Sequence, residues 1–299
     1  IVFAEGEDER VLRAAQAMVE ETSERPILIG RPEVIERRIE KAGLTIKLGE
    51  TVDLVNPEND PRYRDYWETY HNLMARRGVS PDIARAIMRT NTTAIGAVMV
   101  HREEADMNYI EQVLGRDGKR PHGALSLMIL EDGPLFIADT QVHLHPTPEQ
   151  IAEIAIGAAR HVRRFGIEPK IALCSQSQFG NQGEGSGKRL RAAMRLLDAG
   201  NHDFCYEGEM NIDTALDAEL RNRLLPSNRM EGAANVLVFA HADAASGVRN
   251  ILKIKGGGLE VGPILMGMGN RAHIVSPSIT ARGLLNVGAI AGTPVAEYG

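Results

Sequence analysis

The chain has 299 residues, enough for two ordinary domains or one large one. Hydrophobic residues make up 43% and charged residues 25%, as in soluble globular proteins. The net charge of −6 argues against a dedicated nucleic-acid binder, and no apolar run approaches the ~20 residues that span a bilayer. We therefore expect neither a nucleic acid nor a membrane as a partner.

The chain opens with a strand-like run, Ile1–Ala4, which no initiator methionine or signal peptide precedes. We therefore expect the natural chain to continue upstream. An acidic cluster then leads into a helix with apolar residues at Val11, Leu12, Ala15 and Met18, a helical spacing. The alternation of short apolar runs with helical patterns predicts an α/β fold with mainly parallel sheets.

Further elements continue this alternation. Strands are predicted at 26–30, 52–55, 124–130, 135–138, 170–174, 236–239 and 273–275. A helical region covers residues 63–88, and the apolar run Ala94–Val100 follows it. Thr147 is predicted to cap a helix over residues 151–165, with Pro148 just inside its start.

The glycine-rich segment Asn181–Arg189 fails two nucleotide-binding patterns. A P-loop needs glycine where Gln182 stands and Ser or Thr where Arg189 stands. Lys188 occupies the position of the third glycine of a dinucleotide fingerprint. A generic anion-binding turn before a helix and a plain surface loop both remain open, and the spacing alone favours the loop.

No metal site or nucleophile is predicted. His143 and His145 share a strand face with Asp139 nearby, but no Cys/His spacing typical of zinc accompanies them. Cys174 and Cys205 have no activating base beside them, so small buried residues are the better interpretation. Two cysteines are too few for a disulfide framework, which favours a reduced, cytoplasmic setting.

Five segments in order resemble the phosphate acetyl/butyryltransferase family. They are residues 4–12, 138–139 followed by 146–150, 165–170, 232–236 and 262–265, and together they cover nearly the whole chain. The chain is more similar still to the version of this family that is fused behind a malic enzyme. That likeness rests on residues 56–64, 91–93, 109–113, 177–180 and 273–280.

The resemblance implies two α/β domains with a cleft between them, in which coenzyme A lies. The first domain would span 1–142 plus 272–299, and the second, which would form a homodimer or higher homo-oligomer, would span 143–271. A malic enzyme region with NADP and a divalent metal would lie upstream in the same chain. Within this chain the resemblance implies no cofactor, and acetyl-CoA would act as an effector.

The residues that catalyse acetyl transfer in the family are replaced in this chain. Ungapped counting from residues 262–265 sets Pro277 on the family's arginine and Gly283 on its later aspartate, while Ser276 keeps the serine. Two further arginines fall on Asn108 and Met74. Acetyl transfer to phosphate needs cationic donors for a dianion and for the developing oxyanion. We therefore predict no catalytic residues in this chain.

The leading hypothesis is a non-catalytic module that senses acetyl-CoA and regulates a malic enzyme. An active phosphate acetyltransferase and a purely structural oligomerisation domain are the alternatives. The candidates for contacts with acetyl-CoA, from family position and polar character, are Ser175, Ser177, Asn181, Ser246 and Ser276. The family also carries a glycine-containing loop near Asp106 and Met107 that this sequence lacks.

Overall fold

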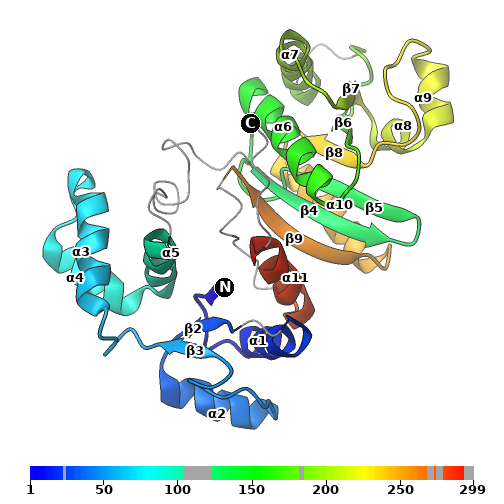
Figure 1. The fold of residues 1–299 in the computed structure, drawn as a ribbon. Coiled ribbons are helices and arrows are strands. Elements are labelled where there is room, and N and C mark those ends of the chain that lie inside the picture. The colour runs from blue at the N-terminus through cyan, green and yellow to red at the C-terminus, as the bar shows by residue number, and fades with distance from the viewer. Residues whose placement is uncertain (23–24, 104–122, 182–184, 268–272, 274–278, 293–299) are drawn as a thin grey trace. The chain divides into compact units, whose positions relative to one another are not determined.

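A computed structural model describes residues 1–22, 25–103, 123–181, 185–267, 273 and 279–292 (Figure 1). Contacts divide the chain into two compact units, Ile1–Arg120 with Met268–Gly299, and Pro121–Gly267. Each unit has its own sheet and its own buried core. Within the described ranges, no helix is long and apolar enough to cross a membrane.

The first unit is built on a small parallel sheet. Its three described strands pair in the order β1-β2-β3. Parallel neighbours need a crossover, and helices α1 and α2 provide it here. The elements are β1 (Val2–Phe3), α1 (Glu9–Thr22), β2 (Ile27–Ile29), α2 (Pro32–Ala42), β3 (Asp53–Val55), α3 (Tyr63–Met74), a short 3-10 helix (Ala75–Arg77), α4 (Pro81–Thr90), α5 (Thr92–Glu103) and α11 (Ala281–Gly292).

Helix α11 completes the core of the first unit. Val11, Leu12 and Met18 lie on one face of α1 because they recur at helical spacing. Leu284 and Leu285 of α11 are buried in the same hydrophobic cluster, and α11 packs directly on α1. Elements from the two ends of the described sequence therefore share one core (Figure 1).

The second unit holds a mixed sheet of six described strands in the order β7-β6-β8-β5-β4-β9. The strands β7, β6, β8 and β5 are parallel, whereas β4 is antiparallel to both β5 and β9. Its elements are β4 (Gly123–Leu130), β5 (Gly133–Ala138), α6 (Pro148–Arg164), β6 (Lys170–Cys174), α7 (Gly185–Ala199), β7 (Cys205–Met210), α8 (Ile212–Leu216), α9 (Ala218–Leu224), β8 (Val236–Phe239), α10 (Ala242–Ile254) and β9 (Leu259–Met266).

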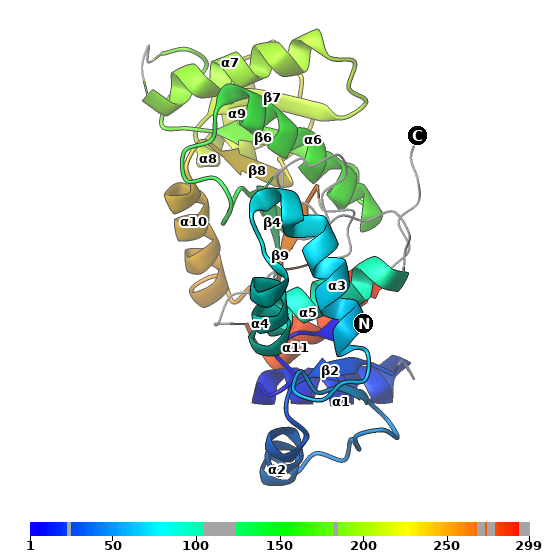
Figure 2. The ribbon, with the colours of Figure 1, turned by 90° about the vertical axis from the view of Figure 1, so that its left-hand side faces the viewer.

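Helices cover both faces of the six-stranded sheet. Ala172 and Leu237 belong to the buried cluster that includes Ala245 of α10, whereas the adjacent Ile171 and Val236 are buried and, by alternation, point to the other face. Helix α10 packs on β4, β5 and β8, whereas α6 also packs on these strands and α7 packs on α6 and on β7 (Figure 2). Burial on both faces explains why β6 and β8 are continuous apolar runs.

Helix α6 starts as the sequence predicts. Thr147 Oγ1 accepts a hydrogen bond from Gln150 N at 3.3 Å, and Gln150 Oε1 accepts one from Thr147 N at 2.8 Å. This reciprocal capping box satisfies two backbone donors, and Pro148 occupies the first helical position. The predicted cap is confirmed, and it fixes the segment before α6 that borders the site described below.

The predicted α/β class with mainly parallel sheets is confirmed, with differences in detail. The strands β7 and β9 are absent from the predicted elements, and Ala94–Val100 lies within α5. The strands β4 and β5 pair with β9 and β8, so they join the second unit, whereas the predicted boundary after residue 142 placed them in the first. Most of the predicted strand 273–275 lies outside the described residues.

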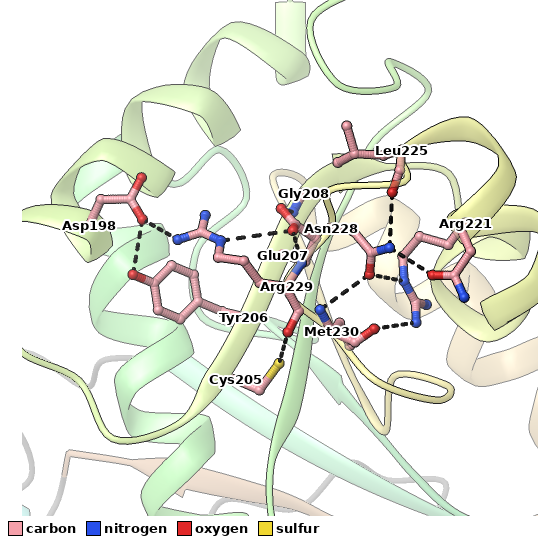
Figure 3. Close-up of polar contacts among 11 residues, drawn as sticks. Asp198, Cys205, Tyr206, Glu207, Gly208, Arg221, Leu225, Asn228, Arg229 and Met230 are labelled. Atoms are coloured by element: carbon pink, nitrogen blue, oxygen red, sulfur yellow. Dashed lines mark hydrogen bonds and ion pairs between the residues drawn. The ribbon is translucent and has the colours of Figure 1, made fainter.

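One buried arginine holds the segment that leads into β8. Arg221 is fully buried, and its acceptors are neutral oxygens of the chain (Figure 3). Its guanidinium donates to Asn228 Oδ1 at 3.1 Å and to the carbonyl oxygens of Thr214, Ala215, Met230 and Gly232. Nearby, Arg229 pairs with Asp198 at 2.7 Å and lies over the Tyr206 ring. The position of β8 therefore depends on polar contacts as well as on its apolar faces.

Replacing Arg221 with Met should strongly destabilise the protein. The change leaves several buried oxygens without donors, each costing about 1–3 kcal/mol. We expect the free energy of unfolding in urea to fall by ~3–5 kcal/mol. Arg223→Met, at an exposed position on the same helix α9, is the control and should shift it by less than about 0.5 kcal/mol. Similar losses in both variants would contradict this role for Arg221.

Candidate functional site

A pocket of about 510 Å³ opens at the carboxyl ends of three parallel strands in the second unit. The connections that follow these strands form its wall, with Ser175 after β6, Asn211 after β7 and His241 after β8. The chain leaves β6 for α7 on one face of the sheet, whereas it leaves the neighbouring β8 for α10 on the other. Parallel α/β sheets bind ligands where neighbouring connections diverge in this way.

The turn after β6, residues 175–181, is built around one buried carboxylate. Glu209 of β7 is fully buried, and its Oε1 accepts hydrogen bonds from Ser177 Oγ at 2.6 Å and Gly180 N at 2.9 Å. The Arg191 guanidinium donates to the same oxygen at 2.7 Å. Hydrogen bonds to a charged acceptor are about twice as strong as neutral ones, so this carboxylate fixes the turn.

Local contacts complete the turn. Asn181 Oδ1 accepts from Gln178 N at 3.0 Å and lies 3.1 Å from Ser177 Oγ. Phe179 has φ of 47°, a left-handed conformation that is uncommon for a bulky residue. Its N–H donates to the Glu209 carbonyl oxygen at 2.7 Å, and this bond holds the strained residue in place. The turn is thus tied to β7 at several points.

Helix α7 begins directly against this turn. Gly187 permits the approach, because a Cβ there would lie 2.8 Å from the Cβ of Ser177. The approach brings Ser186 to the pocket, where its Oγ lies 3.0 Å from Ser175 Oγ. The first N–H groups of a helix lack intrahelical acceptors and carry partial positive charge. This corner therefore offers hydroxyl groups and a helix N-terminus to an anionic group.

The rest of the wall is partly apolar and partly amide. Cys174 and Phe239 are buried, and burial raises the pKa of the Cys174 thiol, which disfavours the thiolate needed for attack. With its amide nitrogen turned toward the turn, Asn211 donates to the carbonyl oxygens of Ser175 at 2.8 Å and Gln176 at 3.1 Å. Such a lining suits binding better than nucleophilic catalysis.

A basic cluster borders the pocket after β8. Arg189 Nη2 lies 2.8 Å from His241 Nε2, and His241 Nδ1 lies 3.0 Å from His145 Nδ1. Burial lowers the pKa of His241, and the neighbouring Arg189 and His145 lower it further. His241 is therefore held mostly neutral at physiological pH.

The structure places the predicted contact residues differently. Ser175 lines the pocket, whereas Ser177 is buried behind it against Glu209, and Asn181 shapes the same turn from an exposed position. Ser246 is half-buried on α10 and is not part of the pocket lining. Ser276 lies outside the described residues. The assignment of these residues to acetyl-CoA stays a prediction.

Five polar residues of the pocket were not singled out by the sequence. They are Gln176, Ser186, Asn211, Asp213 and His241. Gln176 and His241 follow predicted strands closely, so the rule that ligands bind at carboxyl ends could have identified them. Asn211 and Asp213 follow β7, and this strand was not predicted because its sequence is polar. Among the described residues, no group of three or more His, Cys, Asp or Glu side chains could hold a metal ion.

Two of the four positions at which the family resemblance predicts replaced catalytic residues lie in described parts of the chain. Met74 is the last residue of α3 and is half-buried. Gly283 is buried in the first turn of α11, where a Cβ would lie 2.8 Å from Ile279 Cγ1 and 3.4 Å from Thr280 Oγ1. This packing leaves little room for a carboxylate side chain at position 283. Asn108 and Pro277 lie outside the described residues, as do Asp106 and Met107.

Known proteins resemble this chain over nearly its whole length. The chain is 45% identical to an NAD-dependent malic enzyme from Rhizobium meliloti and 42% identical to an NADP-dependent malic enzyme from Salmonella typhimurium. Each match covers 97% of this chain but only 40% of the relative, so the chain spans less than half of either enzyme.

The fold resembles that of a solved phosphotransacetylase. The structure from Streptococcus pyogenes superposes with a TM-score of 0.84 at 25% identity, covering 97% of this chain and 92% of that one. The sequence profile of the phosphate acetyl/butaryl transferase family matches residues 1–292. Because that match takes in both units, the chain belongs to the phosphate acetyl/butaryl transferase family.

Proposed function

We propose that this chain is a regulatory module that binds acetyl-CoA without turning it over and controls a malic enzyme region of the same protein. The pocket at the carboxyl ends of β6, β7 and β8 is the observation that carries this proposal. Its volume falls within the ~300–1,000 Å³ of small-molecule sites. Hydroxyl groups and the start of α7 can hold phosphate oxygens, while Cys174 and Phe239 offer apolar surface to the rest of the ligand.

The replaced catalytic positions support binding without chemistry. Pro277, Asn108 and Met74 carry no charge where the family resemblance implies arginines, and removing one preorganised donor typically costs about 10²–10³ in kcat. Gly283 adds a structural argument, because its Cβ position is blocked by Ile279. The chain could not accept the family's aspartate there without moving its neighbour.

The malic enzyme assignment rests on the relatives. Two of them are malic enzymes more than twice as long as this chain, so the remaining length can hold the malate chemistry, with its nicotinamide cofactor and divalent metal. Association of the modules into a homodimer or higher homo-oligomer would let a bound effector move the attached regions. An active phosphate acetyltransferase is the alternative that the family membership favours.

We expect no phosphate-dependent acetyl transfer by this chain or by Gly283→Asp. The variant should not recover activity, because the new side chain meets Ile279 and the arginines are still absent. A coupled assay of CoA release from acetyl-CoA and phosphate measures turnover directly. Rates near those of ordinary acetyltransferases in the unmutated chain would favour the alternative.

The crowding at Gly283 can be tested through stability. Gly283→Ala should lower the free energy of unfolding by ~1–3 kcal/mol, because the added methyl overpacks the α1–α11 core. The control is Gly247→Ala in α10, where a Cβ meets nothing within 4 Å and helix propensity should stabilise the protein by up to ~1 kcal/mol. Stabilisation by both changes would remove the steric argument.

Filling the pocket should abolish binding without unfolding the protein. Ala244 lines the pocket from α10 and is exposed, so Ala244→Trp adds bulk inside the site only. We expect the affinity for acetyl-CoA, measured by calorimetry, to fall at least ~10-fold, or about 1.4 kcal/mol. Ile251→Trp, exposed on the same helix and outside the pocket, should bind normally. Unchanged binding by Ala244→Trp would place the ligand elsewhere.

In the full-length protein, acetyl-CoA should inhibit malate oxidation. The ligand must bind one global state better than another, and a coupling of ~1–3 kcal/mol would change apparent affinities about 5–150-fold. Inhibition by a metabolite close to pyruvate is the sensible direction for this enzyme. Assays of the intact enzyme and of a version without this module should show inhibition only in the intact one. Equal inhibition of both, or of neither, would refute the coupling.

A further inference from the structure

Arg189 lies against the pocket residue His241, and within the described residues its hydrogen-bond partners are neutral groups. Arg189 donates to His241 Nε2 at 2.8 Å and to the carbonyl oxygens of Pro146 and Ala240, each at 2.9 Å. In the described part of the chain, none of the acceptors of Arg189 is a carboxylate. Arg189 thus keeps a full positive charge that an anion beside it could neutralise.

The hydrogen bonds fix the protonation state of His241. An arginine is always a donor, so His241 Nε2 must accept and the ring proton must lie on Nδ1. His241 Nδ1 then donates to His145 Nδ1, which lies 3.0 Å away and accepts with its own lone pair. His241 is therefore neutral in this arrangement, and the two rings meet edge to face.

The groups around His241 come from every element that borders it. They are Arg189 of α7, His145 before α6, Asp243 in the first turn of α10, and Cys174 and Asp213 in the same pocket wall. Burial, Arg189 and His145 lower the pKa of His241, and Asp243 opposes them. If His241 Nε2 were protonated, its N–H and the Arg189 guanidinium would be two donors facing each other at 2.8 Å, with no acceptor between them. When the two groups move apart to hold one anion, its oxygens can accept from both, and the conflict is removed.

We propose that Arg189 and His241 form the phosphate-binding side of this pocket, and that His241 takes up a proton when a phosphate or pyrophosphate ester binds. This inference rests on the proposed function, to which it adds the residues that recognise the anion and a dependence on pH. In the free protein His241 is neutral. In the complex its imidazolium and the Arg189 guanidinium donate together to the phosphate oxygens.

The sign of the pH dependence follows from this linkage. His241 has a lowered pKa when the pocket is empty, and a bound anion raises it, so binding takes up protons between the two values. Affinity should therefore rise as pH falls through the ordinary imidazole range near 6.5. A complete shift of one pKa unit corresponds to about tenfold in affinity. Phosphate esters also titrate near pH 6, so part of the pH dependence of binding comes from the ligand. The part that comes from His241 is the difference between the unmutated chain and a variant without this imidazole.

Calorimetry of acetyl-CoA binding in two buffers of different ionisation enthalpy measures the proton uptake. We expect uptake by the unmutated chain near pH 6.5, and at least ~3-fold tighter binding at pH 6 than at pH 8 relative to His241→Asn. Arg189→Gln should weaken binding at least ~10-fold, Arg189→Lys should recover part of it, and Arg195→Gln, exposed on the same helix, should bind normally.

A second measurement does not depend on acetyl-CoA. The His241 ring signals, titrated by NMR with and without inorganic pyrophosphate, should report a pKa about one unit higher when the anion is present. If acetyl-CoA fails to bind but pyrophosphate raises this pKa, the proposed function is refuted, whereas the anion site at Arg189 and His241 is supported. If acetyl-CoA binds with equal proton uptake in His241→Asn, or pyrophosphate leaves His241 unchanged, the inference is overturned.

Discussion

The divergence of the chain after β6 and β8 is the constraint on which the site depends. These strands are neighbours, yet α7 and α10 carry the chain to opposite faces of the sheet. The backbone cannot close over the edge between them, so a depression forms there whatever side chains surround it. Residues 175, 211 and 241 meet in it only because three separate connections end at this edge.

A depression becomes a shaped pocket only when its walls are rigid, and Glu209 supplies much of that rigidity. Its Oε1 accepts hydrogen bonds from Ser177 and Gly180, in the turn after β6, and from Arg191 of α7. A buried carboxylate is expensive to desolvate, and the three donors on Oε1 offset part of that cost, whereas Oε2 is buried without a hydrogen-bond partner among the described residues. The carboxylate is thus a positioning group, because it touches the back of the turn whose front carries Ser175.

The sequence predicts those parts of the fold that are encoded locally. The Thr147–Pro148 cap and the apolar strand β6 are visible in a few adjacent residues. The strand β7 is not, since Glu207 and Glu209 are buried in it and a polar strand does not match an apolar pattern. The predicted domain boundary differs from the two compact units at β4 and β5, because strand pairing with distant segments places these strands in the second unit.

The same reasoning explains which site residues could be predicted. Ser175 directly follows a predicted strand, so family position and topology agree on it. Arg189 and His241 are 52 residues apart in the chain and meet only when α7 and β8 flank the same edge. No spacing rule relates them. Ser177, a predicted contact, carries the polar character of a binding residue, yet its hydroxyl is directed to a buried carboxylate.

The proposed separation of binding from chemistry rests on two different parts of the chain. The pocket described above lies wholly in the second unit, whereas Gly283 lies in α11 of the first. At Gly283 packing disfavours any larger residue, since Ile279 occupies the space that a side chain would need. An aspartate at this position would take a second change at Ile279, a buried residue of the α1–α11 core. In the module that we propose, ligand contacts can be kept under selection while catalysis through position 283 is opposed by the stability of the core.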